Sequence, residues 1–153
     1  MSFRNEFLLP AVAASVMSAQ APKMKPICFS TLQPGEYLQV QFRHGGFLFF
    51  YESHIRFRSI GPGLIEAASV NRPDVKAPTI LLTRADAEAI DRLLAYCRVS
   101  KPNSKGPLEE IQITQFINGK MSGEEHLKYS PSELEMQKGI LPFPTLLERF
   151  DAN

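Results

Sequence analysis

The chain has 153 residues, of which 44% are hydrophobic and 22% are charged, a composition typical of one globular domain. Lys and Arg total 17 and Asp and Glu total 16, so the formal net charge is +1. This balance disfavours a dedicated nucleic-acid-binding protein, which usually carries a strong basic excess. No apolar run reaches the roughly 18 residues of a membrane-spanning helix, so we expect no stable membrane insertion beyond a signal segment.

Residues 1–21 follow the order of a secretory signal peptide, which is a basic start, an apolar stretch and small residues at the cleavage site. Arg4 supplies the basic start, residues 7–17 are apolar and uncharged, and Ala19 and Ala21 have the spacing that signal peptidase needs. This order predicts export to the periplasm or the outside of the cell.

The alternative is a cytoplasmic protein whose N-terminal helix begins at Pro10 and packs on the domain. The apolar residues of that helix are Val12, Val16 and Met17. Pro22 favours this alternative, because its locked φ fits a protease cleft poorly after a cut at Ala21. In either case we expect residues 22–153 to form a single α+β domain.

The two cysteines, Cys28 and Cys97, match no zinc or thioredoxin spacing. In an oxidising compartment they could form a disulfide that closes a long loop, which would stabilise the fold by about 4 kcal/mol. The alternative is two separate buried thiols that behave as small hydrophobic side chains.

The first half of the domain predicts a meander of three strands. Residues 37–42 (YLQVQF) alternate between apolar and polar, and residues 54–60 (HIRFRSI) do so again. Between them, residues 47–51 (FLFFY) are apolar on both faces, which is typical of a central strand. The first turn falls at His44-Gly45-Gly46, and Glu52-Ser53 separates the second strand from the third.

Gly61-Pro62-Gly63 ends the meander. Residues 64–70 (LIEAASV) fit either a strand or a short helix, and residues 71–78 (NRPDVKAP) predict a loop. Residues 79–82 (TILL) then predict a strand that leads into a helix.

The principal helix begins after Thr83, which is a good N-cap residue. Asp86 lies three residues later, where it completes a variant of the capping box and complements the helix dipole. Glu88 and Arg92 are spaced to pair on the polar side of the helix. The apolar side, which we expect to pack on the sheet, consists of Ala87, Ile90, Leu93, Leu94 and Cys97.

The second half predicts a hairpin. Residues 109–117 (EEIQITQFI) alternate, and Asn118-Gly119 is a strong signal for a two-residue hairpin turn. A return strand should follow at residues 120–129, with a bulge at Gly123.

The C-terminal part predicts short helical turns. Ser130-Pro131-Ser132-Glu133 combines a capping box with proline at the first helical position, and the helix should run to Lys138 before Gly139 stops it. Residues 141–144 form an extended link to a last helical turn at residues 145–150. The predicted fold class is therefore α+β, with an antiparallel sheet of five or six strands and one principal helix packed on a face.

No motif of a catalytic or metal site is present in the sequence. The spacing of His44, His54 and His126 matches no metal motif, and no nucleophile elbow or phosphate-binding loop occurs. Cys97 lies on the apolar side of the predicted helix, where burial favours an inert, protonated thiol. We therefore expect no cofactor, and a binding protein is favoured over an enzyme.

Residues 43–50 (RHGGFLFF) resemble in part the signature octamer of the RNA-recognition motif. The matching positions are Arg43, Gly46, Phe47 and Phe50. However, Gly45 stands where that family has an aromatic residue that stacks on a base, and no strand and helix precede the octamer. RNA binding is therefore not favoured, although neighbouring strands could still gather an anion-binding stripe from Arg43, Arg56 and Arg58.

The two hairpin tips are candidate contact loops, because loops on a rigid sheet commonly carry recognition. They comprise Arg43, His44, Gly45 and Gly46 in the first hairpin, and Asn118, Gly119 and Lys120 in the second. We expect a small exported protein, such as an inhibitor, an immunity-type protein or an accessory protein, that acts by contact with another protein. The alternative function is an apolar-ligand pocket between sheet and helix, lined by Phe49, Phe57, Ile90 and Leu94.

Overall fold

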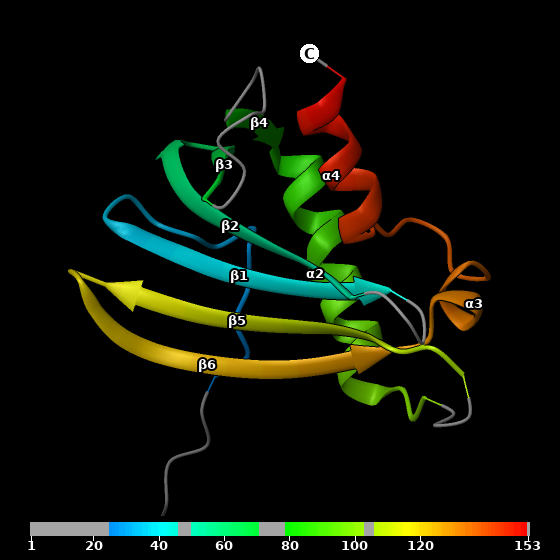
Figure 1. Ribbon diagram of the computed structural model, residues 1–153. Coiled ribbons are helices and arrows are strands. Elements are labelled where there is room, and N and C mark those ends of the chain that lie inside the picture. Colours follow the sequence, from blue (N-terminus) through cyan, green and yellow to red (C-terminus); the bar gives the residue numbers. More distant parts are fainter. Residues whose placement is uncertain (1–24, 46–49, 71–78, 103–105, 153) are drawn as a thin grey trace, which may run out of the picture.

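The computed structural model describes residues 25–45, 50–70, 79–102 and 106–152. Within these residues, one antiparallel sheet has the strand order β4-β3-β2-β1-β5-β6 (Figure 1). The strands are β1 (Glu36–Gly45), β2 (Phe50–Gly61), β3 (Leu64–Ser69), β4 (Thr79–Thr83), β5 (Glu109–Ile117) and β6 (Lys120–Tyr129). The helices are α2 (Arg84–Val99), α3 (Pro131–Leu134) and α4 (Phe143–Asp151). The predicted signal peptide or N-terminal helix at residues 1–21 and the predicted loop at residues 71–78 lie outside the described residues.

The principal helix α2 packs on one face of the sheet, as the sequence predicted. All five residues of its predicted apolar side are buried, namely Ala87, Ile90, Leu93, Leu94 and Cys97. The shorter helix α4 joins it on the same face, because the ring of Phe143 lies 5.5 Å from that of Phe42 and 6.4 Å from that of Phe57. The helices therefore cover one face of the sheet, which we call the inner face.

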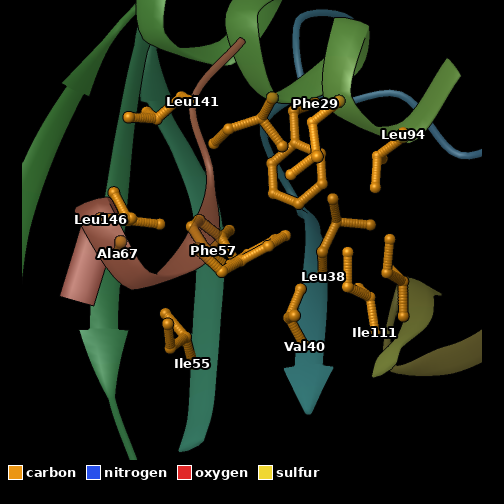
Figure 2. Packing of buried hydrophobic residues seen from close by; sticks show 14 of the residues in the cluster. Phe29, Leu38, Val40, Ile55, Phe57, Ala67, Leu94, Ile111, Leu141 and Leu146 are labelled. Carbon is orange, nitrogen blue, oxygen red and sulfur yellow. The ribbon is translucent and has the colours of Figure 1, made fainter. Parts of the chain in front are cut away.

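The core between sheet and helices also receives a residue from the Pro-rich segment that precedes β1. Phe29 is fully buried, and its ring meets that of Phe57 edge-on at 4.9 Å (Figure 2). The inner face itself is formed by alternate residues of the two central strands, which are Leu38, Val40 and Phe42 of β1 and Ile55 and Phe57 of β2. The Pro-rich segment is therefore part of the packed core rather than a simple lead-in.

The predicted meander is wrong at its second strand. β2 is one continuous strand of 12 residues, and Glu52-Ser53 lies inside it rather than between two strands. The reason is that the alternation continues through this dipeptide, since Ser53 is buried on the inner face and Glu52 faces solvent. Tyr51, at the end of the predicted central strand, is 62% exposed, and residues 47–49 lie outside the described residues.

Pairing of β1 with β2 continues to Gly45 opposite Phe50. His44 and Gly45 therefore belong to β1, so the turn predicted at His44-Gly45-Gly46 is wrong at these two residues; residues 46–49 lie outside the described residues. The predicted end of the strand at Gly61-Pro62-Gly63 is confirmed, and the ambiguous segment after it is the strand β3.

The second hairpin forms as predicted. Asn118 and Gly119 both have positive φ, 51° and 76°, as a type I′ turn requires. The bulge lies one residue before its predicted position. Gly123 pairs with Gln115 and Met121 pairs with Phe116, so Ser122 is the extra residue.

The capping box of α2 is confirmed, and the N–H of Asp86 donates to Thr83 Oγ1 at 3.3 Å. The predicted pair of Glu88 with Arg92 is replaced. Glu88 instead accepts from Arg84 Nε at 3.1 Å, because Arg92 reaches across to donate to the carbonyl of Gly139.

The C-terminal helices differ in length from the prediction. α3 ends at Leu134 rather than Lys138, and the Ser130 side chain contacts Ser132 instead of capping the helix. Without a side-chain cap, the first turn of α3 lacks the stabilisation that a longer helix would need. α4 begins at Phe143, two residues early, because Pro144 fits the first turn of a helix.

Replacing Phe57 with alanine should remove a fully buried ring that touches both Phe29 and Phe143. We expect Phe57→Ala to lower the free energy of unfolding by about 3–5 kcal/mol. Val99→Ala is the matched control, since Val99 is largely exposed, and it should change the value by less than about 0.5 kcal/mol. Urea denaturation followed by circular dichroism measures both, and equal effects would contradict the described core.

Candidate functional site

The face of the sheet turned away from the helices carries polar side chains in register across four strands. We call this surface, formed by β6, β5, β1 and β2, the outer face. Its first row consists of Lys128, Glu110, Arg43 and Glu52, one residue from each strand in that order. The charges therefore alternate in sign across the sheet.

The residues of this row contact one another and form what we call the charge ladder. Lys128 Nζ lies 3.4 Å from Glu110, and the guanidinium of Arg43 lies 3.8 Å from Glu110 and 3.6 Å from Glu52. All four side chains are more than a third exposed. Each pair therefore contributes little to stability. The contacts within the charge ladder fix the positions of its charged groups more than they stabilise the folded state.

The second row of the outer face has the sequence His126, Gln112, Gln41 and His54. Each histidine contacts the glutamate two residues before it on its own strand. The distances are 2.9 Å from His54 Nε2 to Glu52 and 3.1 Å from His126 Nε2 to Glu124.

The glutamines complete two similar clusters. The amide of Gln112 donates to Glu124 at 2.7 Å, and that of Gln41 donates to Glu52. Hydrogen bonds from Gln41 and then from His54 hold the pKa of Glu52 below its ordinary value. The two histidines are three strands apart, about 14 Å, so the clusters stay separate.

Two shallow hollows lie on either side of the second row and share Gln41 and Gln112. Their volumes are about 220 Å³ and about 330 Å³. The smaller reaches the charge ladder at Arg43 and Lys128, and the larger extends toward His54 and Val70. The surface is thus gently uneven and has no deep cleft at this place.

An aromatic cluster follows at the far end of the same face. The rings of Tyr37 and Phe116, which are direct partners on β1 and β5, stack at 4.7 Å. The guanidinium of Arg56 lies 5.5 Å from the centre of the Tyr37 ring. Tyrosine, phenylalanine and arginine in contact are a combination enriched at protein interfaces.

The predicted anion stripe is dispersed over this face. Arg43 lies between Glu52 and Glu110, Arg56 lies over Tyr37, and Arg58 Nε contacts Glu66 at 2.8 Å. The three arginines therefore share one face but alternate with carboxylates and an aromatic ring. Anion binding by Arg43, Arg56 and Arg58 stays a prediction.

The two predicted contact loops lie at opposite ends of the sheet. Glu36 at the start of β1 pairs with Ile117 beside the second turn, whereas Arg43 near the end of β1 pairs with Glu110 (Figure 1). One partner would have to span the length of the sheet to touch both tips. Gly46 lies outside the described residues.

A second candidate site lies where β5 begins and β6 ends, at the opposite end of this hairpin from its turn. Tyr129 is fully buried, and its hydroxyl donates to the carboxylate of Glu109 at the floor of a hollow of about 330 Å³. The walls of the hollow include Pro131, Pro142 and Pro144. Burial raises the pKa of Glu109, although the hydrogen bond from Tyr129 and the charge of His44 partly oppose this effect. Burial, and the bond to Glu109, also raise the pKa of Tyr129.

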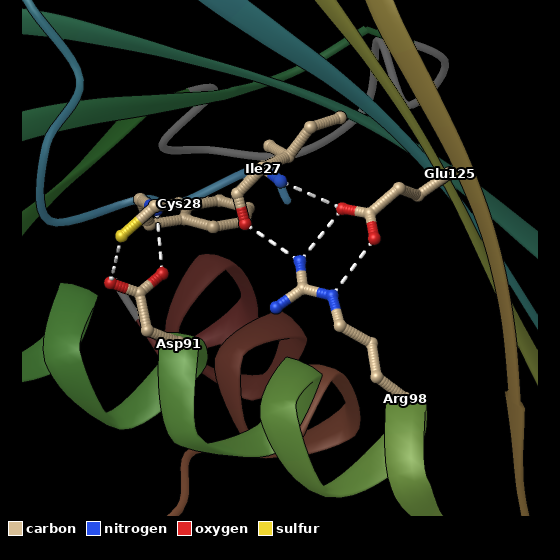
Figure 3. A network of polar contacts seen from close by, with 6 residues as sticks. Ile27, Cys28, Asp91, Arg98 and Glu125 are labelled. Carbon is tan, nitrogen blue, oxygen red and sulfur yellow. Dashed lines mark hydrogen bonds and ion pairs between the residues drawn. The ribbon is translucent and has the colours of Figure 1, made fainter. Parts of the chain in front are cut away.

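The segment before β1 is held by two carboxylates, one on α2 and one on β6 (Figure 3). Asp91 of α2 accepts hydrogen bonds from the N–H groups of Phe29 and Ser30 and from the thiol of Cys28. Glu125 of β6 accepts from the N–H of Ile27 and from Arg98 of α2. These contacts bring Phe29 into the core, so we assign them a structural role.

Both cysteines are free thiols in the structure. Cys97 is buried on α2, and burial raises its pKa to about 12, as expected of an inert thiol. Cys28 is partly exposed and donates to Asp91 at 2.9 Å. The Cys28–Cys97 disulfide stays a prediction.

The two thiols should differ in reactivity in the folded protein. We expect iodoacetamide to label Cys28 in the native state and Cys97 only after unfolding, because Cys97 is buried and protonated at neutral pH. Peptide mapping under non-reducing and reducing conditions measures both. Recovery of a linked Cys28–Cys97 peptide from the native host would instead support the disulfide.

The charge ladder and its neighbours were missed by sequence reasoning as a site. The sequence marks these residues only by their outward positions in strands that alternate between apolar and polar. They are Gln41, Glu110, Gln112, Glu124 and Lys128. Glu110 and Lys128 meet within the predicted hairpin, but their contact with β1 depends on the pairing of β1 with β5, which are separated by three strands and a helix in the sequence.

Comparison of the chain with known protein families, curated proteins and solved structures finds no match in any of the three. Within the described residues, no helix has both the length and the apolar character to cross a membrane. In the same part of the chain, no group of three or more His, Cys, Asp or Glu side chains could hold a metal ion.

Glu109 and Glu125 should affect stability with opposite dependence on pH. Burial raises the pKa of Glu109 above the ordinary value of about 4.5. Burial also opposes ionisation of Glu125, but hydrogen bonds from Arg98 and Ile27 outweigh it and lower its pKa. The stabilising contribution of Glu109 is therefore present below pH 4.5 and lost as pH rises through its folded pKa. The contribution of Glu125 is present above pH 4.5 and lost as pH falls.

We therefore expect Glu109→Gln to gain stability relative to wild type as pH rises from about 4 to about 7. Glu125→Gln should be less stable than wild type at neutral pH, and its deficit should shrink below about pH 4.5. Urea denaturation at several pH values measures both differences. Parallel pH profiles for the two variants would contradict this assignment.

Proposed function

We propose that the protein is a small α+β binding protein that acts by protein–protein contact through the outer face of its sheet. The observation that carries this proposal is the charge ladder and the aromatic cluster at opposite ends of one open, four-stranded surface. The helices α2 and α4 lie on the inner face, so they leave this surface to solvent. We propose that it is exported, which the signal-like order of residues 1–21 supports. Its class would be that of an inhibitor, an immunity-type protein or an accessory protein.

The aromatic cluster provides the kind of side chains that dominate binding energy at interfaces. Tyr37 and Phe116 hold each other in place by stacking, and Arg56 is held over Tyr37. Side chains that are already oriented lose less conformational entropy when a partner binds. Burial of such rings and of an arginine is typical of interface hot spots.

The charge ladder would supply specificity more than affinity. Its charges alternate in sign over a few ångströms, so only a surface with the complementary alternation avoids like-charge contacts. The outer rows and the neighbouring β3 carry four cationic side chains (Arg43, Arg56, Arg58, Lys128) and four anionic ones (Glu52, Glu66, Glu110, Glu124). A nucleic acid, whose charges all have one sign, fits this pattern poorly.

The apolar-ligand pocket predicted between sheet and helix has less support. Phe57, Ile90 and Leu94, three of its four predicted lining residues, are fully buried, and Phe29 and Phe143 pack against Phe57. The fourth, Phe49, lies outside the described residues. A close-packed inner face favours recognition on the outer face.

A photo-crosslinking amino acid at Gln112, in the centre of the outer face, tests the proposal in the native host. We expect a discrete protein adduct from position 112, identified by mass spectrometry, and none from the same probe at Ala95, which is exposed on α2. The adduct should disappear when Arg43→Glu is added, since this change breaks the alternation of the ladder. No adduct at position 112, or the same adducts at both positions, would contradict the proposal.

A further inference from the structure

We infer that the partner of the outer face is a second copy of this chain, placed by a two-fold axis that runs parallel to the strands between β5 and β1. This inference rests on the proposed function, because it names the occupant of the same face. It follows from the order in which the charges of the outer face are arranged. Rotation about this axis stacks the outer faces of the two copies against each other. It places β6 of one copy opposite β2 of the other, and β5 opposite β1.

The charge ladder is complementary to itself under this operation. Read from β6 to β2 its signs are plus, minus, plus, minus, so reversal of the order places every charge opposite its counter-charge. Lys128 of one copy faces Glu52 of the other, and Glu110 faces Arg43. The symmetry makes each of these contacts twice.

Several positions of the remaining rows also fit the same axis. Glu124 of β6 and Arg56 of β2 occupy corresponding ends of the third row, so they face each other and add two further opposite-charge contacts. In the second row the amide of Gln112 faces that of Gln41, and amides can exchange hydrogen bonds. In the fourth row Phe116 faces Tyr37, which joins the two aromatic clusters.

The other two-fold axis in the plane of the sheet is less complementary. An axis perpendicular to the strands through the second row places Lys128 opposite Glu124 and Glu52 opposite Arg56, but Glu110 and Arg43 then face neutral residues. It gives four opposite-charge contacts where the parallel axis gives six. Both axes keep the strands of the two copies aligned, as stacked sheets require, so the number of opposite-charge contacts decides between them.

The dimensions of the face indicate a reversible dimer. Four strands and the span from Tyr37 to Arg43 measure about 19 Å by about 20 Å. This is about 380 Å² of flat area per copy, below the size of stable specific interfaces, so we expect a weak and transient dimer. The alternation within each copy and between copies surrounds each charge with opposite charges, which lowers the cost of removing it from water. The dimer would leave the ends of the sheet and the helix layer free.

Charge reversal in the full-length protein tests the arrangement through its symmetry. Arg43→Glu places a glutamate opposite Glu110 twice, and Glu110→Lys places a lysine opposite Arg43 twice. We expect wild type to show a monomer–dimer equilibrium in sedimentation velocity that weakens with salt, and each variant alone to dimerise about 100-fold more weakly. Glu148→Lys, a charge reversal at an exposed position of α4, should dimerise as wild type does.

An equimolar mixture of the Arg43→Glu and Glu110→Lys variants should restore dimerisation, because each new charge then faces its opposite on the other chain. A purely intramolecular role of the ladder cannot produce this result, since each variant's own ladder stays broken in the mixture. Failure of the mixture to associate would overturn the inference, and so would a wild type that stays monomeric at all concentrations. If the wild type is monomeric but Gln112 still yields an adduct with a different protein, the self-association is refuted and the proposed function stands. If the probe at Gln112 also yields nothing, both fail.

Discussion

The outer face exists because the inner face fixes which side chains of each strand point to solvent. Leu38, Val40 and Phe42 are held against the helices by burial, so the residues between them must face the other way. In a strand this alternation has a period of two, and a slip of one residue would turn the whole set over. Packing around Phe57 therefore determines that Arg43 and Glu52 meet on the outer face.

The segment before β1 contributes to this constraint from outside the sheet. Asp91 holds its backbone on α2, and Arg98 with Glu125 joins the segment, the helix and β6 in one network. The ring of Phe29 is thereby directed onto Phe57. The network ties α2 to β6 at one edge of the sheet. Two of the strands that carry the charge ladder, β6 and β2, are thus held from the inner side by this segment.

Local signals made much of this fold predictable, and the failures have local causes too. The capping box at Thr83 and the turn at Asn118-Gly119 involve residues that are near neighbours in the chain, so their geometry follows from the residue types. The break expected at Glu52-Ser53 was wrong because two polar residues can continue an alternation when one faces the core. Residue type alone does not distinguish a break from an outward position.

The candidate site was beyond such reasoning because it depends on pairing between distant segments. Alternation identified Arg43 and Glu110 as outward residues, but their contact requires β5 to pair with the edge of β1 that β2 does not occupy. The resulting charges are exposed, and exposed pairs add little to stability. Alternating signs keep like charges off neighbouring strands, which favours the ladder within one chain. Because the row has an even number of members, the same alternation makes its order complementary to its own reverse, and this second property is the one that the proposed dimer uses.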